Sequence, residues 1–303
     1  MSARTHLAVL AALGAVFAAP ARADLYYLVV GGLGGEAKYQ EQFDKDTAAV
    51  AAVARRTAGN DHVVVLQGES ATRAALVKAF DSLRTRTKPA DSLAVVLIGH
   101  GSFDGDTYKF NLPGPDIDGG ELKKLLGGVP ARTQLVVNAT SASGAVLDSW
   151  VADGRTVITA TRSGFERNAT RFAEVFAAAL TDGAADINKN GVITAQEAFD
   201  YASRAVADSY KDKGALATEH PQLKGGGAAR FMVARLGAAP SAPANPEVAA
   251  LTTERERLDG EIEALKERRE QMAPDAYLDQ LQKLLVQLAE VQGKIDAAQG
   301  KPQ

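Results

Sequence analysis

The sequence predicts an α/β fold: a mainly parallel sheet covered by helices on both faces, followed by a C-terminal α-helical hairpin. Between residues 24 and 236, short apolar runs alternate with longer segments of helical character. The apolar runs are continuous rather than alternating, which is typical of strands covered on both faces. After residue 246 the composition changes to charged residues and leucines at heptad-like spacing, which is typical of paired helices.

The first 23 residues have the pattern of a secretory signal peptide. Arg4 gives a positive start, an apolar run covers 7–19, and Ala21-Arg22-Ala23 is a small-x-small cleavage signal. We therefore expect a periplasmic or secreted protein with no stable membrane anchor after cleavage. The alternative is an uncleaved anchor helix, for which the apolar run is short.

The main domain is expected to span residues 24–236. We expect its strands at 25–30, 62–66, 93–98, 134–138 and 156–159. We expect its helices at 36–57, 70–84, 120–126, 142–151 and 168–180. A βαβα series of this kind favours a parallel sheet whose ligands bind beyond the carboxyl ends of the strands.

A proline-rich linker at 237–246 is expected to separate this domain from a helical hairpin at 247–303. The two apolar stripes of the hairpin are Leu251, Leu258, Ile262 and Leu265, then Leu278, Leu281, Leu285, Leu288 and Ile295. Pro274 suits the first turn of the second helix. Because each helix is short, we expect the hairpin to dock on the main domain, to bind a protein partner or to self-associate. A loosely ordered tail is the alternative.

The composition excludes several kinds of catalytic and metal-binding site. The 303 residues include no cysteine and carry a formal net charge of -3. Without a thiol there is no disulfide, no cysteine-ligated metal and no thiolate nucleophile, so catalysis would use oxygen or nitrogen groups. Because acidic and basic residues are nearly balanced, the sequence does not indicate a basic surface that would bind nucleic acid or an anionic membrane.

Two turns carry the candidate chemistry. His100 follows the run 93–98 in a glycine-flanked turn, and Ser141 follows the run 134–138 in a turn of small residues. On neighbouring parallel strands these turns would lie side by side at one edge of the sheet. His100 could take the Ser141 hydroxyl proton while the Gly101 N–H stabilises an oxyanion, as nucleophilic acyl transfer requires.

These motifs resemble the caspase-like cysteine peptidases, most closely the legumain-type family and its bacterial relatives. The resemblance begins with His-Gly-Ser at 100–102 and the turn that ends in Ser-Gly at 143–144. It extends over about residues 25–236, through segments at 31–35, 110–116, 157–164 and 217–222. It implies a caspase-like fold, a peptide or protein substrate or ligand, and a histidine base at His100.

The chain departs from this family at the nucleophile, because Ser141 stands where the resemblance implies a cysteine. A serine hydroxyl is a weaker nucleophile than a thiolate unless its base is well placed. Whether the chain is an enzyme therefore stays open. It is a serine hydrolase acting on peptides, a catalytically inactive peptide-binding or scaffold protein, or a protein with another function on a reused fold.

A second motif, at residues 186–197, matches the EF-hand pattern at every required position. Its calcium ligands would be Asp186, Asn188, Asn190, the Val192 carbonyl and Glu197. With only two charged ligands, weak Ca²⁺ binding is expected. A loop that keeps this turn for structural reasons and binds nothing is the alternative.

Gly32 and Gly34 formally fit a dinucleotide-binding fingerprint. The acidic residue expected after the second strand is missing there, since Gln67 follows Leu66. We therefore expect a tight strand-to-helix turn and no cofactor other than Ca²⁺.

Overall fold

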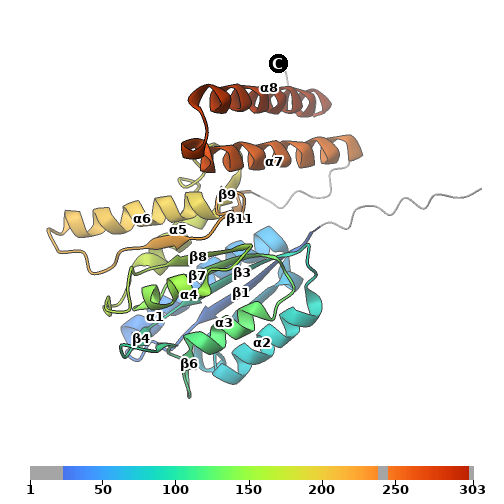
Figure 1. Ribbon diagram of the computed structural model, residues 1–303. Coiled ribbons are helices and arrows are strands. Elements are labelled where there is room, and N and C mark those ends of the chain that lie inside the picture. The colour runs from blue at the N-terminus through green and yellow to red at the C-terminus, as the bar shows by residue number, and fades with distance from the viewer. Residues whose placement is uncertain (1–22, 238–244, 300–303) are drawn as a thin grey trace, which may run out of the picture.

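The computed structural model describes residues 23–237 and 245–299 (Figure 1). The predicted signal peptide, except residue 23, and most of the predicted linker lie outside these residues. In the described part of the chain, no helix combines the length and apolar character needed to cross a membrane.

A six-stranded sheet forms the centre of the main domain, in the order β10-β8-β7-β3-β1-β2. Its strands are β1 (Leu25–Gly31), β2 (Val63–Leu66), β3 (Ser92–Ile98), β7 (Thr133–Asn138), β8 (Arg155–Thr159) and β10 (Gln222–Lys224). All neighbours are parallel except β10, which runs antiparallel to β8. The predicted parallel sheet is confirmed, and each of its five predicted strands lies within one residue of the expected bounds.

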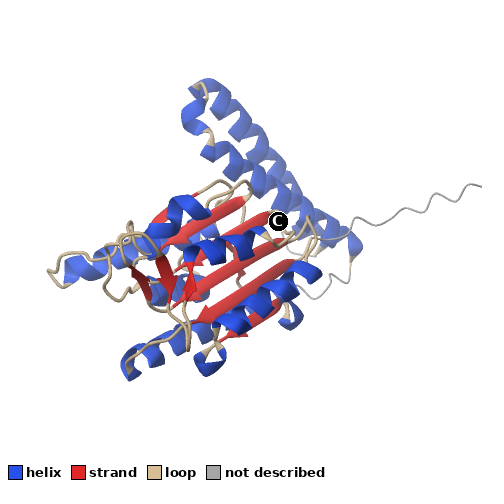
Figure 2. Cartoon of the chain, turned by 60° about the horizontal axis from the view of Figure 1, so that its bottom comes forward, coloured by secondary structure: helices blue, strands red, loops and turns tan. Residues whose placement is uncertain are grey.

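Helices cover both faces of this sheet (Figure 2). One face carries α1 (Ala37–Ala58), α5 (Phe172–Thr181) and α6 (Ala195–Asp212). The other carries α2 (Arg73–Arg86), α3 (Gly119–Gly127) and α4 (Leu147–Trp150). Each face of the sheet has its own hydrophobic core, and successive residues of a strand point into opposite cores, as Leu28 and Val29 do. This burial on both faces is why the strands are continuously apolar.

The helix expected at 142–151 is shorter than predicted. It consists of a 3-10 turn, η3 (Ser143–Val146), followed by α4. Ala142 has φ 55°, in the left-handed region, so a regular helix cannot begin there. The helix expected at 168–180 likewise begins late, at Phe172.

Two small antiparallel sheets were not predicted. The first consists of β4 (Gly101–Phe103), β5 (Tyr108–Phe110) and β6 (Ile117–Asp118), and the second of β9 (Val192–Thr194) and β11 (Met232–Arg235). The first sheet begins at the turn that holds His100. These strands are too short to give a clear periodic signal.

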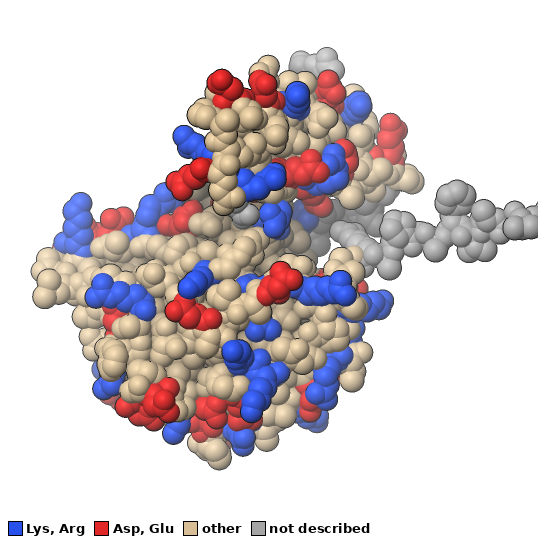
Figure 3. Space-filling model, viewed as in Figure 1, with Lys and Arg blue, Asp and Glu red and all other residues tan. Residues whose placement is uncertain are grey.

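The C-terminal hairpin is confirmed, with α7 (Pro246–Glu267) and α8 (Pro274–Ala298) joined through η4 (Arg269–Gln271). Leu258, Val291 and Ile295 are buried between the two helices. Figure 1 places α7 beside β9 and β11, and the Arg235–Glu256 ion pair of 2.9 Å ties it to β11. In Figure 3 the hairpin forms a lobe above the sheet domain, with acidic and basic side chains intermixed on its surface.

Candidate functional site

The turns that carry His100 and Ser141 lie at the same edge of the sheet. β3 and β7 are neighbours, and Leu97 of β3 pairs with Asn138 of β7. His100 and Ser141 each follow one of these paired residues by three positions. The backbone of Gly101 approaches the Ser141 turn closely, since a Cβ at position 101 would lie 2.5 Å from the Ser141 carbonyl oxygen. The expected adjacency of the two strand ends is therefore present.

The half-buried His100 ring packs against α1 rather than on the serine. It makes edge contacts with Tyr39 and Phe43, with ring centroids 4.9 and 5.0 Å away. Burial lowers the pKa of His100, while a hydrogen bond to the Gly34 backbone and the charge of Glu36 oppose this effect. The imidazole is thus kept neutral at physiological pH, the form that can accept a proton.

Ser141 is almost completely covered, with 1% of its surface exposed. Within the described residues, no hydrogen bond joins its side chain to the His100 ring. A serine needs a well-placed base to act as a nucleophile. The arrangement therefore brings the two turns together without forming the hydrogen-bonded pair of an activated serine.

A buried hydrogen-bond network holds the Ser141 turn in place. The Tyr108 hydroxyl, from β5, lies 2.7 Å from Thr140 Oγ1 and accepts a hydrogen bond of 3.1 Å from Asn138 Nδ2. Thr140 Oγ1 also lies 3.0 Å from the Ser141 carbonyl oxygen. Burial raises the pKa of Tyr108 to about 12, so the phenol stays protonated. The unpredicted small sheet thus fixes the position of the candidate nucleophile.

The next residue, Ala142, holds a backbone conformation that side-chain-bearing residues seldom adopt. Its φ is 55°, and its N–H donates to the Glu166 carbonyl at 2.8 Å. Positive φ in a non-glycine residue costs about 1 kcal/mol or more and persists only where surrounding contacts impose it. The segment that contains Glu166 supplies such a contact from beyond β8.

The segment 161–166 packs over the Ser141 turn through side chains as well. Thr161 Oγ1 accepts from the Gly144 N–H at 2.8 Å and lies 3.2 Å from Ser143 Oγ. Farther along, Phe165 is 70% exposed and its ring contacts Phe103 of β4, with centroids 5.6 Å apart. The rim of the candidate site therefore carries an exposed aromatic group.

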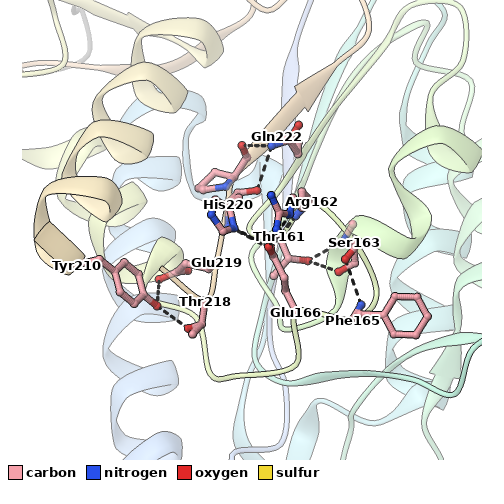
Figure 4. Close-up of polar contacts among 12 residues, drawn as sticks. Thr161, Arg162, Ser163, Phe165, Glu166, Tyr210, Thr218, Glu219, His220 and Gln222 are labelled. Carbon is pink, nitrogen blue, oxygen red and sulfur yellow. Dashed lines mark hydrogen bonds and ion pairs between the residues drawn. The ribbon is translucent and has the colours of Figure 1, made fainter. Parts of the chain in front are cut away.

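Glu166 forms a polar cluster that the sequence did not reveal (Figure 4). Its Oε1 lies 2.5 Å from His220 Nδ1, and its Oε2 accepts from the His220 N–H at 3.2 Å. Arg162 adds an ion pair of 3.1 Å to the same carboxylate. Because His220 lies just before β10, the cluster ties the edge strand to the loop after β8. Residues 54 positions apart give no local signal of such a contact.

Glu219, the neighbour of His220, is 2% exposed and caps α5. Its carboxylate accepts hydrogen bonds from the N–H groups of Arg171 and Phe172 and from the Tyr210 hydroxyl. Burial raises the pKa of Glu219, while these hydrogen bonds lower it. The segment 218–220 is therefore fixed to the start of α5, to Tyr210 of α6 and to Glu166, and Figure 4 shows the last two of these contacts.

The EF-hand-like loop lies away from these turns, between α5 and α6. Asp186 Oδ1 and Asn188 Oδ1 both accept from the Asn190 N–H, at 3.1 and 3.0 Å, so the two oxygens converge. Gly191 has φ 79°, as the sharp turn requires. Glu197 Oε2 instead accepts from the N–H and hydroxyl of Thr194, which caps α6. Among the described residues, no cluster of three or more His, Asp or Glu side chains suited to a metal is formed.

Other parts of the chain pack directly against the glycine-rich turn after β1. A Cβ at Gly32 would lie 2.6 Å from the Asn111 carbonyl oxygen, and one at Gly34 would meet the backbone of Gln40. These glycines serve close packing.

Comparisons with known proteins identify neighbours by structure only. No family model matches the chain, and no curated protein matches it. A solved protein from Geobacter sulfurreducens is 13% identical, with a TM-score of 0.46, covering 66% of this chain and 92% of that one. Caspase-1 from Spodoptera frugiperda is 11% identical, with a TM-score of 0.46 and coverage of 67% and 86%. The Drosophila initiator caspase Dronc is 11% identical, with a TM-score of 0.41 and coverage of 67% and 79%.

Proposed function

We propose that this chain is a peptidase-like protein of the legumain type that binds peptides at the carboxyl edge of its sheet without cleaving them. The observation that carries the proposal is the state of Ser141, which is 1% exposed and has no hydrogen bond to the His100 ring within the described residues. The sequence motifs around these two residues supply the resemblance to peptidases. We further propose a periplasmic or secreted location, on the pattern of residues 1–23.

Exposed apolar side chains at the same edge support peptide binding. Phe165 is 70% exposed beyond β8, and Leu33 is 42% exposed beyond β1. Both side chains lie beyond strand ends at this edge and are exposed enough to contact a bound peptide. A peptide backbone there would meet the hydrogen-bonding groups of the loops that follow four neighbouring parallel strands, β8, β7, β3 and β1.

A serine hydrolase is the second candidate. It is favoured by the neutral His100 imidazole and by the close approach of Gly101 to Ser141. Catalysis would require Ser141 to turn toward His100, which would accept the hydroxyl proton as the oxygen attacks a peptide carbonyl. The Gly101 N–H would then stabilise the oxyanion.

One experiment separates the two candidates. Residues 24–303 are incubated with a fluorophosphonate, which labels activated serines, and separately with a random peptide library read by mass spectrometry for retained and cleaved peptides. The variants are Ser141→Ala, Ser141→Cys and, as a matched control, Ser209→Cys on α6. We expect retained peptides without labelling in the native chain, and cleavage only in Ser141→Cys.

Labelling of the native chain that disappears in Ser141→Ala would replace the binding proposal by the hydrolase. A library that leaves no peptide retained and none cleaved would contradict both candidates.

We also propose that the loop 186–197 binds Ca²⁺ weakly. The convergence of Asp186 and Asn188 oxygens supports this, and Asn190, the Val192 carbonyl and Glu197 would complete the set. Calorimetric titration should give a dissociation constant of roughly 10⁻⁴ to 10⁻³ M, the range of weakly charged extracellular sites. Glu197→Gln should weaken binding at least about tenfold, whereas Glu174→Gln on α5 should not. Flat traces for the native chain would contradict the proposal.

A further inference from the structure

A cavity of about 210 Å³ lies between α7 and the small sheet of β9 and β11. It shares no lining residue with the turns that carry His100 and Ser141. Its apolar lining comes from Val192, Ala229 and Met232, and its charged lining comes mainly from α7. The volume is below the range of about 300 to 1,000 Å³ typical of drug-sized pockets, so a small metabolite suits it.

Arg255 lines this cavity with unused hydrogen-bonding capacity. Its Nε is buried and has no hydrogen-bond partner. Its two other contacts, to the Asn190 carbonyl and to Gln292 Oε1, are both 3.4 Å long. A buried donor without a partner destabilises the folded chain, and an acceptor on a bound ligand removes that cost. A carboxylate is the acceptor that a guanidinium binds best, through two parallel hydrogen bonds.

Asp259 lines the same cavity one helical turn farther along α7. Within the described residues its carboxylate forms no ion pair, and burial raises its pKa while the charge of Arg255 and the Asn190 side chain lower it. It lies within electrostatic reach of Arg255, since residues four apart on a helix are neighbours. The cavity thus presents a cationic donor and an anionic acceptor side by side.

The other charged groups of the lining are already engaged. Arg235 pairs with Glu256 at 2.9 Å, and Glu263 pairs with Lys266 at 2.6 Å. Arg230 also has a partner. Arg255 and Asp259 are therefore the two lining charges without an ion pair in the described residues, which favours a molecule that carries both a carboxylate and an ammonium group over a polyanion.

We propose that the cavity binds a free α-amino acid with an apolar side chain. Arg255 would bind the α-carboxylate, Asp259 the α-ammonium, and Val192 and Met232 would contact the side chain. No bond is made or broken in this binding, and the turns of His100 and Ser141 take no part in it.

Calorimetry and thermal unfolding of residues 24–303 with three probes test the proposal. L-leucine carries both charged groups, N-acetyl-L-leucine lacks the ammonium, and L-leucinamide lacks the carboxylate. We expect L-leucine to bind and to raise the melting temperature, and each analogue to bind at least about tenfold more weakly, since each leaves one charged side chain of the lining unpaired.

Variants on α7 provide the second readout. Arg255→Met keeps much of the side-chain volume and should weaken leucine binding at least about tenfold, and Asp259→Asn should do the same. Arg257→Gln is the matched control, because Arg257 pairs with Glu254 and Glu261 on the exposed face of the same helix. Absence of leucine binding, equal binding of all three probes, or full binding in a folded Arg255→Met variant would each overturn the proposal.

Discussion

The backbone of Gly101 lies against the carbonyl oxygen of Ser141, so closely that a Cβ at position 101 would stand 2.5 Å from that oxygen. The same Cβ would lie 2.7 Å from Thr140 Oγ1 and from the Tyr108 ring. The two candidate turns are thus packed on each other through backbone atoms, and this packing holds whether or not the site is catalytic.

Gly101→Ala should therefore lower the free energy of unfolding by about 1 to 3 kcal/mol, the usual cost of overpacking, because backbone atoms must move to admit the methyl group. Urea denaturation measures it. Gly127→Ala is the control, since a Cβ there meets nothing within 4 Å. Equal stability changes in the two variants would show that the turns are not in contact.

Tyr108→Phe should also destabilise the chain, by about 1 to 3 kcal/mol, because Asn138 and Thr140 lose a buried hydrogen-bond partner. The matched change Tyr201→Phe removes a partly exposed hydroxyl bonded to Asp182 and should alter stability by no more than about 0.5 kcal/mol. Thermal unfolding of both variants makes the comparison. A Tyr108→Phe variant as stable as the native chain would contradict the role of this network.

Glu166→Gln should loosen the segment 161–166, since the neutral amide weakens the contacts to His220 and Arg162. Hydrogen exchange should then accelerate at the N–H of Arg162, which donates to Glu166 Oε2. Glu174→Gln is the control, because the ion pair of Glu174 with Arg171 is exposed and 3.7 Å long, and such pairs contribute little. Unchanged exchange in Glu166→Gln would show that the segment is held by other contacts.

Asp46 should make stability depend on pH in the opposite direction from an ordinary salt-bridged carboxylate. Burial raises the pKa of Asp46 to about 6, against a hydrogen bond from Gln42 that lowers it. The folded state therefore holds this proton more tightly than the unfolded chain, whose aspartate pKa is about 3.9. The stabilisation is full below about pH 4 and is lost as the pH rises through about 6.

Asp46→Asn should accordingly raise the free energy of unfolding at pH 8, by about 1 to 3 kcal/mol, with no comparable gain at pH 4. Denaturation curves at the two pH values measure the difference. Asp81→Asn, at a half-exposed site paired with Arg84, should show no such gain at pH 8. A gain in Asp46→Asn that is the same at both pH values would contradict the assignment.

The sequence predicted the parallel sheet because burial on both faces leaves continuous apolar runs, as in β3 (Ser92–Ile98). It did not predict β10, because Gln222–Lys224 has only three residues, two of them polar, and forms a strand through its pairing with β8. The late start of the helix at η3 was not predicted either, because alanine rarely adopts a positive φ and the sequence around Ala142 does not indicate one.

The part of the candidate site that the sequence could predict is the placement of its two turns at neighbouring strand ends. The register of Leu97 and Asn138 brings the two turns together, as expected. The orientation of the His100 ring toward Tyr39 and Phe43 depends on how α1 packs, which local sequence does not encode. The contact of Glu166 with His220 likewise arises only when β10 has joined the sheet.

The pairing of β10 with β8 has a consequence for how the chain folds. The segment between the two strands includes α5 and α6, so this edge closes across a long stretch of sequence, and such contacts form slowly. Loops 161–166 and 218–220 adjoin the two strands and meet only at that closure. We therefore expect the sheet to be largely assembled before these two loops meet, so that a partly folded chain would have a core but an incomplete candidate site.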